Sequence, residues 1–297
     1  MDSFLWIFIL LPVIAVLYFG VGLLAAVTMT RVGDHPQYAE TPGTYGLMYR
    51  TVQVVSRVDQ FKLAAWYIPR QDADRALILV HGRDASKQNA ISGRLPALAA
   101  ELHGMGLAVL MLDLRGHGES EGQRYTWGVF ERRDVLGAVD FLSREGFASG
   151  RMAVLGISLG GTAAVGAAFE DEAIGALVLD STFADLQDLV KPNWRRESGL
   201  PMFMLPSVFM MWQALYRFDL RRVKPARELA EMAPRPVLVL HSRSDEAVPV
   251  LHGRQLAEAA PMGELVVFEG CDHAELFRDA PEIYLDVLRK FIDVKWV

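Results

Sequence analysis

The sequence contains only one cysteine, Cys271, in 297 residues. An internal disulfide is therefore excluded, and cysteine usage does not demand an oxidising compartment. The seven histidines are scattered, and none pairs with cysteines or carboxylates at the spacing of metal ligands, so neither a metal nor another cofactor is predicted. The net charge of −6 and the lack of a basic stripe argue against nucleic acid as a partner.

Charged residues are also missing from residues 4–27. This stretch is long enough to span a bilayer, which takes about 20 apolar residues. A cleaved signal peptide is a weaker alternative, because its apolar region would be shorter and preceded by positive charge, whereas only Asp2 and the free amine precede this one. A buried helix of a soluble core is the other alternative. We expect a transmembrane anchor over residues 1–30 and a folded domain over 31–297.

Lysine and arginine are absent before the apolar stretch, whereas Arg31 and Arg50 follow it. Positive residues flanking a membrane span tend to stay on the cytoplasmic side. The sequence thus predicts a single-pass membrane protein whose main domain faces the cytoplasm.

Residues 156–160 read Gly-Ile-Ser-Leu-Gly, between an apolar run at 152–155 and a small-residue helical pattern at 161–168. A serine on a sharp strand-to-helix turn, with glycines that let the helix pack against the strand, is the arrangement of a nucleophile elbow. A purely structural Gly-Ser turn is the alternative, but here the required strand and helix flank the motif. Ser158 is therefore the candidate nucleophile.

A serine hydroxyl becomes a good nucleophile when a base takes its proton and a carboxylate orients that base. A buried strand pattern at 236–241 runs into a loop containing Asp245, and another at 265–269 runs into a loop containing His273. We therefore expect Asp245 as the acid and His273 as the base. Glu246 and Asp180 are competing carboxylates, and His117 is a less favoured second base.

An acyl-transfer site also needs backbone N–H groups that bind the oxyanion. The residue after the serine, Leu159, would supply one of them. Arg83 would supply the other, because it follows the apolar strand pattern at 76–80. The Arg83 side chain either pairs with Asp84 on the surface or reaches an acidic group on the substrate.

The chain order Ser158, Asp245, His273 resembles that of a serine hydrolase of the α/β-hydrolase superfamily. The resemblance covers roughly residues 48–295. Within the superfamily, the chain is most similar to membrane-anchored α/β-hydrolase-domain proteins related to prolyl-oligopeptidase-type catalytic domains, and it lacks the extra glycines of the lipase-type HGGG motif. The resemblance implies an α/β fold with a mostly parallel eight-stranded sheet and helices on both faces. Besides Ser158, Asp245 and His273, the residues that carry the resemblance are His81-Gly82, Asp113-Leu114-Arg115-Gly116-His117-Gly118-Glu119-Ser120, Gly156-Ile157-Ser158-Leu159-Gly160-Gly161 and Val248-Pro249.

From residue 76 onward, continuous apolar runs alternate with helical patterns, as in a parallel sheet covered on both faces. The runs at 49–55 and 61–67 alternate enough to predict a pair of strands. We expect one domain, because about 250 residues can bury a full core without metal or disulfides. Helices are predicted near 94–103, 129–145, 159–169, 251–260 and 280–293.

Residues 184–232 interrupt the alternation, at a position where hydrolases of this kind commonly carry a helical cap. The stretch 201–216 is rich in methionine and aromatic residues. One interpretation is a helix packed on the core; the other is an apolar acyl pocket or a lid apposed to a membrane. On the second interpretation, the candidate substrate-binding residues are Met204, Phe209, Met211 and Trp212.

These features together predict a membrane-tethered serine hydrolase. Its substrate would be an ester or thioester of a partly hydrophobic acyl group, a small-molecule or lipid-like compound, cleaved through an acyl-enzyme without a cofactor. A small-peptide serine peptidase is one alternative. The other is a catalytically dead scaffold on the same fold, bound to the membrane.

Overall fold

The computed structural model describes the backbone of residues 2–33 and 38–296, and the side chains of that range from residue 8 onward. Internal contacts divide the chain into two units, which are described separately below. The smaller unit comprises Met1–Arg31 and Leu186–Val223, and the larger comprises Val32–Asp185 and Lys224–Val297.

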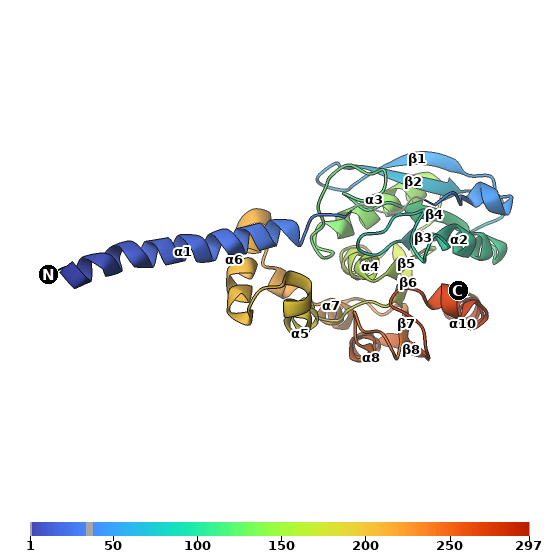
Figure 1. The fold of residues 1–297 in the computed structure, drawn as a ribbon. Coiled ribbons are helices and arrows are strands. Elements are labelled where there is room, and N and C mark those ends of the chain that lie inside the picture. The colour runs from blue at the N-terminus through green and yellow to red at the C-terminus, as the bar shows by residue number, and fades with distance from the viewer. Residues whose placement is uncertain (1, 34–37, 297) are drawn as a thin grey trace. The chain divides into compact units, whose positions relative to one another are not determined.

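Within the described residues, the larger unit is built on one sheet of eight strands in the order β1-β2-β4-β3-β5-β6-β7-β8 (Figure 1). β2 pairs antiparallel with β1 and β4, and the remaining neighbours pair in parallel. The expected eight-stranded, mostly parallel sheet is therefore confirmed. The strands are β1 (Arg50–Val55), β2 (Lys62–Ile68), β3 (Ala76–Val80), β4 (Ala108–Leu112), β5 (Met152–Ile157), β6 (Ile174–Asp180), β7 (Pro236–Ser242) and β8 (Met262–Phe268).

Helices cover both faces of this sheet, because the inner strands are apolar at every position. Leu77 and Leu79 of β3 belong to a core with α2 (Leu95–Gly104), α9 (Leu276–Asp279) and α10 (Pro281–Val294). The intervening Ile78 is equally buried on the opposite face. The helices of that face are α3 (Glu131–Arg144), α4 (Leu159–Glu170), α7 (Pro225–Glu231) and α8 (Val250–Ala259), and a short 3-10 turn, η1 (Pro42–Tyr45), precedes β1.

The strand order reverses at β3: β4 lies on one side of it and β5 on the other. Loops that leave the carboxyl ends of β3 and β5 diverge at such a switch point and leave a crevice, the usual place for a site in an open α/β sheet. The loops after β7 and β8 leave the same edge of the sheet, because these strands are parallel to β5.

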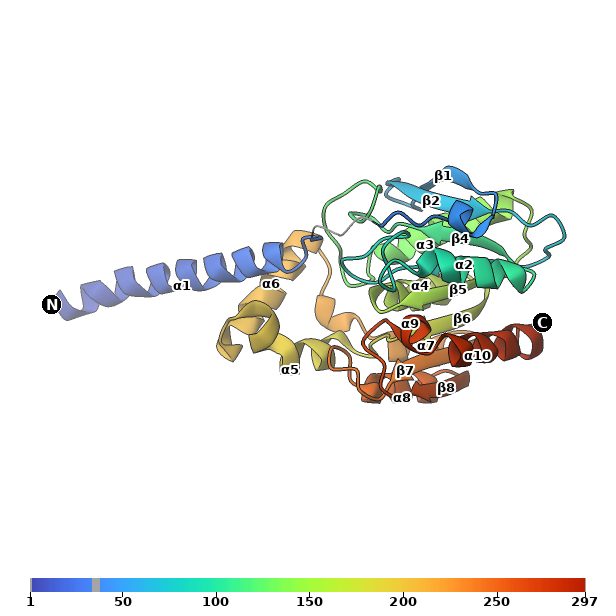
Figure 2. The ribbon, with the colours of Figure 1, turned by 45° about the vertical axis from the view of Figure 1, so that its right-hand side comes forward.

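The smaller unit joins the N-terminal helix to helices from between β6 and β7. α1 (Asp2–Thr28) lies beside α6 (Leu205–Tyr216) in both views (Figures 1 and 2). α1 is the one helix of the described residues that is long and apolar enough to cross a membrane. The unit is completed by α5 (Leu186–Ser198) and the 3-10 turns η2 (Met202–Met204) and η3 (Leu220–Arg222). α7 belongs to the larger unit, so the helices grouped with α1 end earlier than the insertion expected at 184–232.

Candidate active site

Ser158 occupies the turn between β5 and α4 with a backbone conformation, φ 51° and ψ −111°, that serine rarely adopts. Such strain persists only where the surrounding structure enforces it. A Cβ on Gly160 would lie 2.5 Å from the carbonyl oxygens of Val80 and His81, and a Cβ on Gly156 would overlap the carbonyl of Gly160. The glycines of the motif are therefore required by the close approach of α4 to β3 and β5.

His273, in the loop after β8, lies between Ser158 and Asp245. Its Nε2 is 3.1 Å from Ser158 Oγ, and its Nδ1 is 2.7 Å from Asp245 Oδ2. Because a carboxylate oxygen only accepts hydrogen bonds, Nδ1 donates to Asp245 and Nε2 is left to accept the serine hydroxyl. The His273 side chain is 27% exposed, whereas Asp245 is buried. Solvent can thus reach the imidazole but not the carboxylate.

Backbone N–H groups of the loop after β7 bind the carboxylate of Asp245. Asp245 Oδ1 accepts hydrogen bonds from the N–H groups of Ala247 at 2.9 Å and Val248 at 2.7 Å, so Oδ2 remains for His273. Glu246 is exposed, and the hydrogen bond of the imidazole Nδ1 goes to Asp245 instead. Of these two neighbouring carboxylates, Asp245 is the one that contacts the candidate base.

His241, at the end of β7, lies beside this pair and was not singled out by the sequence pattern. Its Nε2 donates to the carbonyl of Val248 at 2.7 Å and lies 3.6 Å from Asp245 Oδ2. Burial lowers the pKa of His241, which favours its neutral form. The neutral His241 ring adds no charge next to Asp245. Its hydrogen bond holds the carbonyl of Val248, the residue whose N–H binds the Asp245 carboxylate.

Asp180, the other competing carboxylate, ends β6 and is bound elsewhere. Its Oδ2 accepts from the Tyr284 hydroxyl at 3.0 Å and its Oδ1 from the Ser181 hydroxyl at 2.9 Å. Ser181 Oγ in turn accepts from the N–H of Ala274, the residue after His273, at 3.1 Å. Asp180 therefore contacts the loop that carries the imidazole through Ser181, not the imidazole itself. Tyr284 and Ser181 carry no motif, and sequence reasoning missed them both.

The two predicted oxyanion donors come from adjacent elements. Leu159 is the first residue of α4, and N–H groups of a first helical turn lack an intrahelical acceptor. Gly82, next to Arg83 in the loop after β3, packs on the nucleophile: a Cβ there would lie 3.4 Å from Ser158 Cβ. The Arg83 guanidinium Nε lies 3.4 Å from Asp84 Oδ2, in line with the surface pairing considered above.

Several known proteins are similar to this chain in sequence. Residues 71–210 fit the family model described as "Serine aminopeptidase, S33". The chain is 30% identical over 243 residues to an uncharacterized protein of Mycobacterium tuberculosis, Rv2307c, covering 80% of this chain and 78% of the relative. It is 28% identical to the alpha/beta hydrolase domain-containing protein WAV2 of Arabidopsis thaliana, covering 88% of this chain and 84% of that one. The chain belongs to the α/β-hydrolase superfamily.

Solved structures agree with this assignment at the level of the fold. The esterase Pf2001 of Pyrococcus furiosus superposes with a TM-score of 0.72 at 23% identity, over 90% of this chain and all of that one. The esterase RhEst1 of a Rhodococcus species superposes with a TM-score of 0.58 at 21% identity, over 83% and 99% of the two chains. The chain is thus similar to esterases in the path of its backbone.

Two further histidines of this α/β-hydrolase have structural partners. The Nε2 of buried His81 accepts from the N–H of Leu114 at 3.0 Å, and its Nδ1 lies 2.8 Å from the carbonyl of Gly82. His117 Nδ1 lies 2.9 Å from the carbonyl of Arg115, and its Nε2 accepts from the N–H of Asp84 at 3.4 Å. Both rings hold the loops after β3 and β4, and His117 contacts neither Ser158 nor Asp245 in the bonds described.

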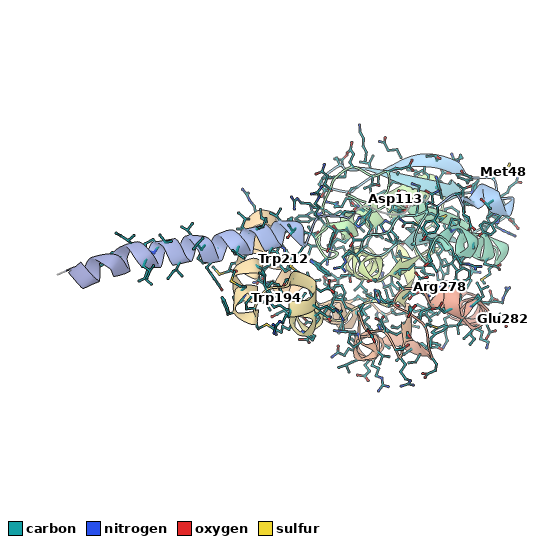
Figure 3. The ribbon with its side chains drawn as sticks, viewed as in Figure 1. Met48, Asp113, Trp194, Trp212, Arg278 and Glu282 are labelled. Carbon is teal, nitrogen blue, oxygen red and sulfur yellow. The ribbon has the colours of Figure 1, made fainter. Side chains whose placement is uncertain are left out.

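The loop after β3 also contains a buried cation that sequence reasoning missed. Lys87 Nζ lies 2.6 Å from Asp113 Oδ2 and 2.5 Å from Glu119 Oε2, and Asp113 Oδ1 accepts from the Lys87 N–H at 2.6 Å. Figure 3 labels Asp113 inside the larger unit. Asp113 also accepts from the Glu119 N–H at 3.0 Å. This ion pair ties the loop after β3 to the glycine-rich loop after β4.

The four candidate substrate-binding residues lie on or next to α6 of the smaller unit. Met204, Phe209 and Trp212 are buried, and Met211 is half-buried. The rings of Phe209 and Trp212 meet edge to face, with their centroids 5.3 Å apart. Figure 3 labels Trp212 on this helix. The exposed apolar side chains of the segment are others, Met202, Phe203, Met210 and Leu215.

We expect Asp180→Asn to change how stability depends on pH. Burial raises the pKa of Asp180 to about 6 from its ordinary value of 3.8, so between these values the folded protein binds more protons than the unfolded chain. Stability due to this group therefore falls as pH rises through that range. Asparagine cannot ionise, so the melting temperature of the variant should rise relative to wild type from about pH 4 to pH 7. Thermal unfolding followed by circular dichroism measures the difference.

The matched control for this prediction is Asp286→Asn on α10, whose carboxylate is 60% exposed. Its melting temperature should follow that of wild type at every pH. A constant difference between Asp180→Asn and wild type across the range would show that folding does not raise the pKa of Asp180 and would contradict the prediction.

Proposed function

We propose that this α/β-hydrolase is a membrane-tethered serine hydrolase that cleaves an ester or thioester of a partly hydrophobic acyl group. The observation that carries the proposal is the line of contacts from Ser158 Oγ to His273 Nε2 at 3.1 Å and from His273 Nδ1 to Asp245 Oδ2 at 2.7 Å. A serine, an imidazole and a buried carboxylate in this order can transfer a proton away from the nucleophile during attack.

In the proposed mechanism, Ser158 Oγ attacks the carbonyl carbon while His273 takes the hydroxyl proton. Asp245 orients the imidazole and stabilises its charged form. The backbone N–H groups of Leu159 and Arg83 bind the oxygen as negative charge develops on it. The tetrahedral intermediate expels the alcohol or thiol, which takes the proton from His273. Water then attacks the acyl-enzyme by the same route and releases the acid.

The membrane tether in this proposal rests on α1. Residues 8–28 form a helix of mean hydropathy 2.6, little of it buried within the described residues. Arg31 and Arg50 follow the helix, and positive residues that flank a membrane span tend to stay on the cytoplasmic side, which favours a cytoplasmic larger unit. The substrate then comes from the cytoplasm or from the cytoplasmic leaflet.

A peptidase that acts on small peptides is the second candidate, because the matching family model is described as a serine aminopeptidase. The same residues would attack an amide. Two solved structures with this fold are described as esterases, which favours the ester. Assays of the purified protein on matched p-nitrophenyl esters and amino-acid p-nitroanilides distinguish an esterase from a peptidase. A higher kcat/KM on the anilides would make the peptidase the better assignment.

We predict that longer acyl chains are better substrates than acetyl. Each methylene buried on binding is worth about 0.8 kcal/mol, or about fourfold in kcat/KM, until the apolar surface that receives the chain is full. The measurement is a series of p-nitrophenyl esters from acetyl to octanoyl with the full-length protein. If kcat/KM falls steadily from acetyl upward, the acyl group of the substrate is not hydrophobic, and this part of the proposed function is wrong.

A further inference from the structure

α6 follows the last three turns of α1 in a regular way. The Tyr18 hydroxyl donates to the carbonyl of Phe203 at 2.9 Å, and the Trp212 indole N–H donates to the carbonyl of Ala26 at 2.9 Å. These partners are 185 and 186 residues apart in the chain. The hydroxyls of Thr30 and Tyr216, also 186 apart, lie within 2.6 Å of each other. The nearly constant separation means that α6 runs beside α1 in the same direction.

The two helices meet through small residues. A Cβ added to Gly22 would lie 2.5 Å from Ser207 Oγ, so glycine at this position lets the helices approach closely. The next buried positions on this face of α1 are Ala25 and Ala26. Close contact through glycine, alanine and serine, with side-chain to backbone hydrogen bonds, is how helices associate within a bilayer.

The depth of this contact follows from the length of the apolar stretch. Charged residues are absent from Ser3 to Thr30, and a span takes about 20 residues. Every window of that length within this stretch contains Tyr18. If α1 spans the membrane, as in the proposed function, Tyr18 lies in the hydrocarbon layer, and so does the carbonyl of Phe203 that it binds. The start of α6 must then enter the layer as well.

The exposed face of α6 is suited to that environment. The exposed large side chains of η2 and of the first half of α6 are apolar: Met202 is 54% exposed, Phe203 68% and Met210 50%. The polar Gln213 comes later, near the end that lies beside Thr30. The apolar end of the exposed face is thus next to the middle of α1, and the polar end is next to the end of α1.

At the carboxyl ends of α1 and α6, charge follows the same gradient. Arg31 is the first charged residue after the apolar stretch of α1, and Arg217 is the first after that of α6. These two arginines are 186 positions apart, the same separation as that of Thr30 and Tyr216. Arginines also precede the segment, Arg195 and Arg196 at the end of α5, and long cationic side chains can extend to lipid headgroups while their stems remain in apolar surroundings. In total, residues 186–223 contain six Lys or Arg and three Asp or Glu, although the whole chain is acidic. This segment therefore complements an anionic lipid surface.

From these contacts we infer that residues 202–216 form a second membrane-inserted segment, which enters one leaflet beside α1 with Phe203 deepest and Leu215 near the headgroups. The partner of the exposed α6 face is a lipid bilayer. The inference rests on the transmembrane role proposed for α1. It makes the smaller unit a membrane module of two helices rather than a single anchor with a separate lid.

The test places a fluorescent nitrobenzoxadiazole label at a single cysteine in full-length protein carrying Cys271→Ser. The variants are Phe203→Cys, Met210→Cys and Leu215→Cys. The control is Leu251→Cys on α8, since Leu251 is an apolar residue of the larger unit that is 61% exposed. Each protein is reconstituted in phosphatidylcholine–phosphatidylglycerol vesicles. Quenching is measured with aqueous iodide and with lipids carrying a doxyl group near the headgroup or in the middle of the acyl chain.

We expect labels at 203 and 210 to emit at shorter wavelength than the label at 251 and to resist iodide. The mid-chain doxyl group should quench the label at 203 most, and the doxyl group near the headgroup should quench the label at 215 most. If iodide quenches the labels at 203 and 210 as strongly as the label at 251, the inference of a second inserted segment is wrong. If the same protein resists carbonate extraction, the transmembrane role proposed for α1 is still supported. If carbonate releases the protein, the tether in the proposed function falls too.

Discussion

Replacing Ser158 by alanine is expected to reduce ester hydrolysis by about four to six orders of magnitude, because the removal of a triad nucleophile leaves only binding and oxyanion stabilisation. The fold should be retained, since alanine keeps the Cβ and loses only the hydroxyl. The measurement is kcat/KM on a p-nitrophenyl ester together with the melting temperature. A fluorophosphonate probe should label wild type and not the variant.

The matched control is Ser143→Ala, which removes an exposed serine hydroxyl from α3 in the same unit. It should keep full activity and full labelling. If Ser158→Ala retained more than a few per cent of the activity, Ser158 would not be the nucleophile. If wild type neither hydrolysed esters nor reacted with the probe, the catalytically dead scaffold would become the better interpretation.

The geometry around Ser158 could be predicted because its signal is local. Two glycines flank the serine within five residues, and each is required by a backbone approach of α4 to a neighbouring strand. Asp245 and His273 were located by a similar rule, since parallel strands present the residues that follow them at one edge of the sheet. The sequence therefore identified three side chains that the structure connects, with His273 within hydrogen-bond distance of both Ser158 and Asp245.

Element boundaries were less predictable where burial is incomplete. β8 was expected at 265–269, whereas the structure has it at Met262–Phe268. Its first residues, Met262, Gly263 and Glu264, are exposed because β8 lies at the edge of the sheet. A strand that is solvated at one end lacks the continuous apolar run by which a buried strand is identified.

Contacts between distant segments had no signal in the sequence. Asp180 and Tyr284 are 104 residues apart, and neither stands in a recognisable motif. The pairing of α1 with α6 depends on Gly22, which is indistinguishable from the other glycines of an apolar stretch until Ser207 is seen beside it. Such contacts depend on which elements the fold brings together, and no local periodicity encodes that choice.

The second large effect is expected for Asp245→Asn, which should lower kcat by about 10⁴-fold. Asparagine can donate a hydrogen bond where the carboxylate only accepts, so it favours the imidazole tautomer with the proton on Nε2. His273 could then no longer accept the proton of Ser158, although the distances in the site would change little. The size of the effect follows from the chemistry of the 2.7 Å contact between His273 Nδ1 and Asp245 Oδ2.

Glu246→Gln is the matched control, because it neutralises the adjacent, exposed carboxylate in the same loop by the same chemical change. It should alter kcat by less than about twofold, since an exposed charge beside water contributes little. Steady-state kinetics on one ester, with thermal unfolding to verify the fold, measure both variants. If Glu246→Gln lost activity and Asp245→Asn kept it, the acid would be Glu246, and the loop after β7 would have to rearrange during catalysis. If neither lost activity, a carboxylate outside this loop would orient His273, and Asp180, already connected to the His273 loop through Ser181, would be the next residue to replace.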